Sequence, residues 1–302
     1  MIDKAGHSGV IAVAVNAFVY ISLCLIWGST WLAIKIGLSQ APPFTTAAVR
    51  FALAAVALTL IGLIRRSRYP KDLKSLLSLA YPGFHMYGLS YALVYVGQQY
   101  IDSATGAVLF AAYPFFVAAL SWWKYRTEKL DSVAWLGMGI GLAGVVVISF
   151  DSFQASPDIF FGTVLLIASS LAAAYGAVIH KHKFSQVDIV VAANVQMIFG
   201  GLFLVIGALV LEKWSDFHVT ATAVGSIVYL ALAGTVVAFL GYYWLLRHLR
   251  LTVVALIAFI TPLVAILIGV FLAEESLTLL TVVGSVLILG GVLLVIRKQS
   301  PA

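Results

Sequence analysis

Charged side chains and cysteine are both scarce in this sequence. Only 10% of its 302 residues are charged and 62% are hydrophobic, whereas a soluble protein carries about 25% charged and about 45–50% apolar residues. So few charges cannot cover a surface that faces water, which excludes an ordinary soluble domain. The single cysteine, Cys24, lies in an apolar run and excludes an intrachain disulfide and a cysteine-based metal cluster.

Signatures of ATP-driven pumps and of common hydrolases are also absent. The dipeptide Gly-Lys does not occur, so there is no Walker-type phosphate-binding loop. There is neither a His-Glu-x-x-His zinc motif nor a Gly-x-Ser-x-Gly elbow. His180 and His182 flank Lys181, but no further metal ligand is evident near them. The acidic residues are scattered singly, without the paired carboxylates of an active site. We therefore predict that the protein is not an enzyme and needs no metal and no cofactor.

Long hydrophobic segments dominate what the sequence does contain. A membrane-spanning helix needs about 20 mostly apolar residues, and regular β-structure is not expected because spanning strands alternate in hydrophobicity. The connections are short and leave no room for a soluble domain. We predict an all-α integral membrane protein with ten transmembrane helices, at residues 13–38, 43–64, 81–100, 103–123, 132–150, 159–180, 189–211, 221–246, 251–273 and 278–296.

Basic residues gather on one side of this predicted bundle. Runs of lysine and arginine follow the second and fourth segments, and smaller groups follow the sixth, the eighth and the last. Cytoplasmic loops are enriched in these residues, and an even number of segments returns the chain to the side where it started. We expect both termini in the cytoplasm. The net charge of +6 then reflects orientation and lipid contacts rather than a nucleic-acid partner.

The two halves of the sequence resemble each other. Shifting the sequence by 148 residues, and by 147 near the end of each half, superimposes several aromatic, basic, proline and glycine positions. The aligned pairs are Trp27 with Tyr175, Lys35 with Lys183, Tyr95 with Tyr243, Pro114 with Pro262, Glu128 with Glu275, Gly137 with Gly284 and Gly144 with Gly291. In one order and at a nearly constant offset, they predict a duplication, with one repeat at 1–150 and the second at 151–302.

An odd number of helices in each repeat has a topological consequence. With five helices per repeat, the second copy enters the membrane the other way up, which gives an inverted repeat. Inverted repeats are an architecture of transporters, with the substrate near the midplane between the repeats and access that alternates between the two sides. Pro114 and Pro262 lie mid-segment at equivalent positions, where proline interrupts helical hydrogen bonding. We predict that they are hinges.

Aromatic and hydroxyl side chains predict the substrate site. Tyr87, Tyr91 and Tyr95 are spaced by four residues on one face of the third segment, with His85 nearby. Such a face suits a cavity that binds an organic solute and still holds water. The alternative is helix packing, with tyrosines at the level of the lipid headgroups. The full set of predicted substrate-binding residues is Trp27, His85, Tyr87, Tyr91, Tyr95, Tyr175, Thr235, Phe239 and Tyr243.

Two basic residues and a glycine motif have simpler expected roles. Lys35 lies close to a helix end, so we expect its amine to reach the membrane surface. Arg50 is expected to behave similarly and to pair with Asp102. Gly137 and Gly141 form a Gly-x-x-x-Gly motif, which predicts either tight helix packing or dimerisation.

The sequence also resembles a known family, the EamA domain of the drug/metabolite transporter superfamily. The resemblance covers nearly the whole chain as two EamA units. It implies ten helices and secondary transport, usually export, of amino acids or related metabolites, and within this branch the chain is similar to bacterial aromatic amino acid exporters. The residues that carry it are Trp27-Gly28-Ser29-Thr30, Lys35, Arg50, Pro114, Pro262, Glu274-Glu275, Gly284 and Gly290-Gly291.

Together the residues and the resemblance predict a secondary transporter in a bacterial inner membrane. It would export small neutral or zwitterionic metabolites such as amino acids, with the lipid bilayer as its surroundings and a monomer or a weak dimer as its assembly. Proton relays usually need a buried carboxylate, and none is expected near the midplane, so we predict a facilitator. An exchanger of phosphorylated or nucleotide-linked sugars, which needs deep basic residues, and a lipid-modifying membrane enzyme are the alternatives.

Overall fold

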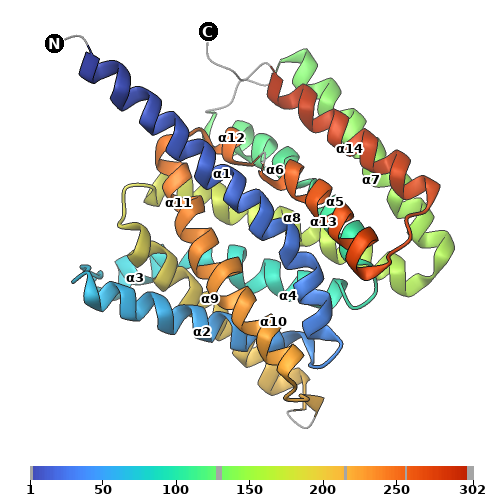
Figure 1. The fold of residues 1–302 in the computed structure, drawn as a ribbon, viewed down its shortest axis with the longest axis horizontal. Helices are drawn as coiled ribbons and strands as arrows, with labels where there is room; N and C mark the ends of the chain where they lie inside the picture. Colours follow the sequence, from blue (N-terminus) through green and yellow to red (C-terminus); the bar gives the residue numbers. More distant parts are fainter. Residues whose placement is uncertain (1–2, 127–130, 214–215, 256, 298–302) are drawn as a thin grey trace.

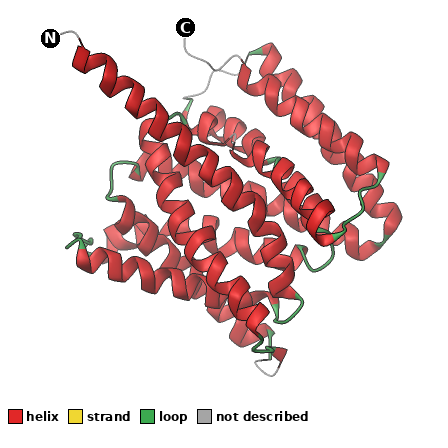
Figure 2. Cartoon of the chain, viewed as in Figure 1, coloured by secondary structure: helices red, strands yellow, loops and turns green. Residues whose placement is uncertain are grey.

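The computed structural model describes residues 3–126, 131–213, 216–255 and 257–297 (Figure 1). Within these ranges the chain is helix, turn or loop, and no strand occurs (Figure 2). Eight helices of the described chain are long and apolar enough to cross a membrane, and the apolar helix Leu279–Leu294 is shorter. The predicted all-α membrane fold is confirmed.

Each of the ten predicted segments corresponds to one helical passage. Six passages are single helices: α1 (Asp3–Leu38), α2 (Pro43–Ile64), α7 (Ser132–Ala155), α8 (Pro157–Phe184), α9 (Ile189–Leu211) and α14 (Leu279–Arg297). The other four consist of shorter pieces, in which η marks a π-helical turn. They are α3 (Leu73–Gly83) with η1 (Phe84–Leu89) and α4 (Ser90–Gly97); α5 (Ser103–Phe110) with α6 (Tyr113–Leu120) and η2 (Ser121–Tyr125); α10 (Ala221–Ala231) with η4 (Leu232–Val237) and α11 (Ala238–His248); and α12 (Leu251–Ala255) with α13 (Ile257–Ala273).

Polar side chains fix where several helices begin. The Asp188 carboxylate accepts hydrogen bonds from the first main-chain amides of α9, and the hydroxyls of Ser156 and Thr220 do the same for α8 and α10. Such caps satisfy amides that have no partner inside the helix. At the start of α2, Glu212 from the end of α9 accepts from the amides of Phe44 and Thr45, both at 2.7 Å. A carboxylate there is also favoured by the helix dipole.

Two of the composite passages are interrupted at equivalent places. The π-turns η1 and η4 begin at residues 84 and 232 and end at 89 and 237, so both ends are 148 residues apart. This is the offset of the sequence repeat. Single π-turns inside α-helices are common at functional sites, and these two occur in the passages that carry the tyrosine stripe and its counterparts.

The fourth passage breaks directly before Pro114. Ala111 and Ala112 form a turn between α5 and α6, and Pro114 is the second residue of α6, where its missing N–H costs no helical hydrogen bond. Its repeat counterpart Pro262 lies inside α13 instead. The role of the two prolines as hinges stays a prediction.

The helices pack with an internal two-fold pattern. Helix α2 packs on α9, while α7 packs on α14 along one edge of the molecule (Figure 1). Helix α1 packs on α13, α10 and α11, and its counterpart α8 packs on α6, α3 and α4. Each of these helix contacts therefore has an equivalent contact in which every helix is replaced by its counterpart from the other repeat.

Glycines bring α7 and α14 close together. A Cβ on Gly144 would lie 2.5 Å from the carbonyl oxygen of Gly284, and a Cβ on Gly291 would lie 2.4 Å from that of Gly137. Adding 147 to Gly144 and subtracting 147 from Gly284 gives Gly291 and Gly137, so the two contacts are equivalent in the two repeats. The same Cβ on Gly291 would lie 2.6 Å from the amide nitrogen of Gly141. The Gly-x-x-x-Gly motif thus serves packing between two helices of one chain.

We predict that Gly144→Ala destabilises the protein, because the added methyl group must displace the backbone of α14, and overpacking of this kind costs about 1–3 kcal/mol. Gly139→Ala on the same helix is the matched control, since a Cβ there meets no atom within 4 Å and alanine is the better helix former. The measurement is thermal unfolding in detergent, with size-exclusion chromatography reporting how much folded protein is left at each temperature. It should give a lower melting temperature for Gly144→Ala only. Equal melting temperatures would contradict the close approach of the two helices.

Candidate functional site

A cavity between the two halves holds about 800 Å³ of empty space, its open mouth included. Small-molecule sites are mainly apolar and aromatic with a few polar groups, and the lining of this cavity fits that description. Arg50 is the only charged side chain among the described residues that line it. The aromatic lining consists of Trp27, Trp31, Tyr91, Phe110, Tyr113, Phe239 and Tyr242.

Repeat counterparts line this cavity together. Four pairs of lining residues are related by the 148-residue offset, and they come from the third and fourth passages of each repeat. The cavity therefore lies on the two-fold axis of the fold. The first and second passages break this symmetry, because α1 and α2 contribute Trp27, Thr30, Trp31, Ile34 and Arg50 while α8 contributes Ala173. The symmetric pairs are Tyr91 with Phe239, Val94 with Tyr242, Phe110 with Ala258, and Tyr113 with Thr261.

The π-turn η4 of the second repeat contacts the first repeat through Trp27. The Trp27 indole N–H donates to the Gly234 carbonyl oxygen at 3.2 Å. The same ring packs against Phe239 and Tyr242, with ring centroids 5.2 and 5.5 Å apart. A main-chain acceptor in η4 and two rings of α11 thereby hold Trp27 in the cavity wall.

Arg50 reaches the cavity from α2. It lies seven residues after the start of the helix, about 11 Å along its axis, and only 1% of it is exposed. Its Nε donates to the Thr235 hydroxyl at 2.8 Å, Nη1 to the Tyr95 hydroxyl at 3.2 Å and Nη2 to the Gly234 carbonyl at 3.3 Å. The expectation that Arg50 reaches the membrane surface is therefore wrong, because its guanidinium is buried among groups of both repeats.

Five of the nine residues predicted to bind substrate lie at or directly behind the cavity wall. Trp27, Tyr91 and Phe239 line the cavity. Tyr95 and Thr235 are fully buried behind the lining and hold the guanidinium. Their roles in binding stay predictions, but the structure brings all five together at one site.

Tyr87 and Tyr243 belong to a buried polar chain beside the cavity. Their hydroxyl oxygens are 2.7 Å apart, and the Tyr243 hydroxyl donates to Gln196 Oε1 at 2.6 Å. The Gln196 amide nitrogen lies 3.0 Å from His180 Nδ1. The Tyr87 ring packs edge-on against Phe239 with centroids 4.7 Å apart, so these tyrosines support the wall without lining it.

His85 and Tyr175 lie in a second aromatic cluster, outside the lining of the central cavity. Their ring centroids are 4.9 Å apart. The Tyr175 hydroxyl lies 3.3 Å from that of Tyr81 and accepts a hydrogen bond from Lys124 Nζ at 3.1 Å. The cluster joins α3, η1 and η2 to α8 on the side of the molecule where the basic loops lie.

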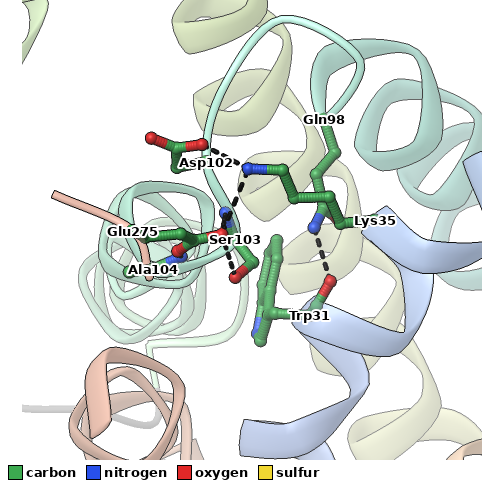
Figure 3. Close-up of polar contacts among 7 residues, drawn as sticks. All are labelled: Trp31, Lys35, Gln98, Asp102, Ser103, Ala104 and Glu275. Carbon is green, nitrogen blue, oxygen red and sulfur yellow. Dashed lines mark hydrogen bonds and ion pairs between the residues drawn. The ribbon is translucent and has the colours of Figure 1, made fainter. Parts of the chain in front are cut away.

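Lys35 contacts two carboxylates, and we call Lys35, Asp102 and Glu275 the latch (Figure 3). Its Nζ donates to Glu275 Oε1 at 3.1 Å and also contacts Asp102. Glu275 is buried, and it accepts the Ser103 amide and hydroxyl at 3.0 and 2.7 Å and the Ala104 amide at 3.0 Å. The carboxylate thereby caps α5, where the helix dipole favours a negative charge. The expected partner of Asp102, Arg50, is replaced by Lys35.

The equivalent positions in the second repeat do not form a latch in the described residues. The counterpart of Lys35 is Lys183, an exposed residue with no ion pair to a described acidic side chain. Asp102 is replaced by a basic residue, Arg250, and the counterpart of Glu275, Glu128, lies outside the described residues. Among the described residues, an ion pair of this kind therefore occurs at one end of the two-fold scaffold.

Several lining residues were not predicted. Trp31 follows Trp27 by four residues and shares its helical face, a signal that is present in the sequence. Tyr113 and Tyr242 hydrogen-bond to each other through hydroxyls 2.8 Å apart, and neither has an aromatic repeat counterpart that would single it out. The predicted position of Arg50 at the membrane surface is wrong, because the distance of a residue from a helix end does not show which neighbours cover its side chain.

Comparisons with known proteins agree with this fold. A family model described as the EamA-like transporter family matches residues 15–150 and again 160–297. An Escherichia coli K12 protein named "Uncharacterized inner membrane transporter YedA" is 30% identical over 85% of this chain and 82% of its own. "Uncharacterized transporter YoaV" of Bacillus subtilis is 27% identical over 90% and 93%. A crystal structure with 16% identity has a similar fold, with a TM-score of 0.70 over 95% of this chain and 99% of that chain.

We predict that Glu275→Gln opens the latch end, because hydrogen bonds to a charged group contribute about 1.5–3 kcal/mol. Glu274→Gln is the matched control, since Glu274 is the exposed neighbour. Spin labels at Gln99→Cys and Leu272→Cys, in a Cys24→Ser background, report the distance between the repeats at this end. Glu275→Gln should lengthen the distance in detergent while Glu274→Gln leaves it unchanged. An equal response of the two variants would exclude a latch.

The same labels should respond to pH. Burial raises the pKa of Glu275, but bonds from the Ser103 hydroxyl, from the Ala104 and Ser103 amides and from Lys35 outweigh it and hold the pKa below its usual value. The closed latch is therefore fully stabilised above the pKa of a free glutamate, about 4.3, and loses this stabilisation as the pH falls through the lowered value. The labels should move apart only below about pH 4.

Proposed function

Because this chain belongs to the EamA-like transporter family, we propose that it is a secondary transporter that exports small amino-acid-like metabolites from a bacterial cytoplasm. The family membership makes it a multi-pass membrane transporter with two repeats. Export, amino acids as substrates and a place in the inner membrane are our proposals. The relative named as an inner membrane transporter supports the last of these.

The observation that carries this proposal is the aromatic cavity on the two-fold axis. Its walls come from both repeats, so a movement of one repeat against the other changes the opening on each side. Binding at the interface of inverted repeats is what alternating access requires. The lining offers rings, hydroxyls and one guanidinium, which suits small neutral or zwitterionic solutes with an apolar part.

The position of the latch distinguishes the two ends of the cavity relative to the membrane. We propose that the basic loops at the opposite end face the cytoplasm, because cytoplasmic loops are enriched in lysine and arginine; the latch is then on the outer side and both termini are cytoplasmic. The latch then closes the cavity towards the outside, and Lys35 with its two carboxylates acts as an outer gate. We also propose that residues 1–150 and 151–302 are the two units that rock, with Pro114 and Pro262 close to the bending points.

A sugar exchanger and a lipid-modifying enzyme fit the structure less well. A phosphorylated or nucleotide-linked sugar carries two or more negative charges, whereas a single guanidinium borders the cavity among the described residues. A lipid-modifying enzyme needs paired carboxylates or a nucleophile at a headgroup, and the buried Glu275 is held by the first turn of α5 and by Lys35. We propose a monomer, because the glycine motif of α7 is used against α14 within the chain.

We predict that Tyr91→Ala and Phe239→Ala weaken transport of phenylalanine in proteoliposomes. Loss of an aromatic contact in the cavity removes about 0.5–1.5 kcal/mol beyond area burial, so the half-saturation concentration should rise about two- to tenfold. Phe18→Ala is the control, since Phe18 is 73% exposed on α1. Unchanged kinetics in both cavity variants would place the substrate elsewhere.

We predict facilitated transport without proton coupling. No carboxylate lines the cavity in the described chain, and His85 lies outside it. Counterflow of phenylalanine at equal pH on both sides should be fast, and a pH gradient alone should not concentrate the solute. Uphill accumulation that is driven by the gradient and abolished by His85→Ala would overturn the facilitator and assign the proton to His85.

A further inference from the structure

Arg50 is a buried cation whose described partners are all neutral. Its hydrogen bonds go to two hydroxyls and one main-chain carbonyl, and no described acidic side chain forms an ion pair with it. The carboxylates of Asp102 and Glu275 contact Lys35 instead. Keeping an unpaired charge in a low-dielectric interior is strongly unfavourable, and charges inside membrane segments mark substrate paths.

The guanidinium also has a donor to spare. It carries five N–H groups, and the three described hydrogen bonds use one on each nitrogen. The Tyr91 hydroxyl is a further partner of the guanidinium, which leaves one of the five N–H groups outside these contacts. A guanidinium N–H is a strong donor to a carboxylate oxygen. The Tyr91 ring, whose centroid is 4.8 Å from Arg50 Cζ, fixes the guanidinium from the cavity lining.

We propose that Arg50 binds the carboxylate of the transported solute. This proposal deepens the proposed function and rests on it, because it names the chemical class that the cavity selects. The solute carboxylate compensates the buried charge, and the guanidinium N–H outside the described contacts orients it. Thr235 and Tyr95 act as positioning residues that hold the guanidinium at the cavity edge.

The charge balance favours a carboxylate over a phosphate. A phosphomonoester carries almost two negative charges at neutral pH, so one arginine would leave about one of them buried without a counter-charge. No lysine and no second arginine is found among the described lining residues. A monoanion leaves the site neutral, and a carboxylate oxygen accepts from the remaining N–H group.

The rest of the cavity selects an apolar body and does not require an amine. The lining is aromatic and aliphatic next to Arg50, with Ser90, Thr30 and Thr261 as hydroxyls. No described lining residue is acidic, so a substrate ammonium group meets only hydroxyls and ring faces. Amino acids and deaminated acids with the same side chain should therefore both bind.

The first experiment compares analogues on the wild-type protein. Trp27 and Trp31 line the cavity, so tryptophan fluorescence of the purified transporter reports binding. The probes are L-phenylalanine, 3-phenylpropionate, phenethylamine, L-phenylalaninamide and 2-phenylethyl phosphate, with leucine, 4-methylpentanoate and leucinamide as an aliphatic series. Both carboxylates of each series should bind about ten- to hundredfold more tightly than the amine and the amides, the range for hydrogen bonds to a charged group.

The second experiment removes the guanidinium. Arg50→Gln should abolish the preference for carboxylates, while the amides should bind as they do to the wild type. Arg50→Lys keeps the positive charge and should therefore restore part of the preference for carboxylates. Arg65→Gln is the matched control, because Arg65 is an exposed residue after α2 whose ion pair with Asp188 is long, at 3.9 Å. It should leave binding unchanged.

The outcomes separate this proposal from the proposed function. Amides that bind and are transported as well as the carboxylates would overturn the role of Arg50 while leaving a transporter. Tighter binding of 2-phenylethyl phosphate than of both carboxylates would overturn the choice of carboxylate. A reconstituted protein that binds the carboxylates through Arg50 but moves none of them would refute transport and retain the site. The wild-type series tests the carboxylate preference by itself, so the proposal stays falsifiable even where Arg50→Gln fails to fold.

Discussion

The Gly234 carbonyl is the point where the two repeats are tied together at the cavity. It lies in the π-turn η4 and accepts hydrogen bonds from Trp27 of α1 and from Arg50 of α2. A spanning helix in lipid satisfies its own backbone, and irregular backbone is tolerated only where protein or a cavity covers it. The buried residues of η1 and η4 meet this condition, and the aromatic wall and the guanidinium both contact η4.

An inverted repeat gives two equivalent scaffolds, but the side chains need not follow the symmetry. The glycine contacts between α7 and α14 and the paired cavity residues preserve it. Lys35 and Lys183 do not, because only Lys35 faces two described carboxylates. The latch therefore makes the two ends chemically different among the described residues.

The sequence predicted the helices better than the site. Helices α2 and α9 begin and end where their apolar runs do, since Arg65 and Glu212 are too polar to continue a span. The π-turns have no comparable signal, because a wider turn depends on what packs against it. Tyr91 and Tyr87 belong to one predicted stripe, yet Tyr91 lines the cavity and Tyr87 bonds to a buried hydroxyl. Which neighbour covers each face is a tertiary fact that spacing alone does not contain.

The different partners of Lys35 and Arg50 connect closure of the cavity with selection of the solute. Both were expected to reach the membrane surface, but Lys35 is neutralised by the latch carboxylates and Arg50 is left with neutral partners. If Arg50 binds a solute carboxylate, an empty closed cavity holds an uncompensated charge and a loaded one does not. Closure around the solute is then favoured over closure around water. The carrier would return loaded more readily than empty, which is why exchange should outpace net flow in a facilitator built this way.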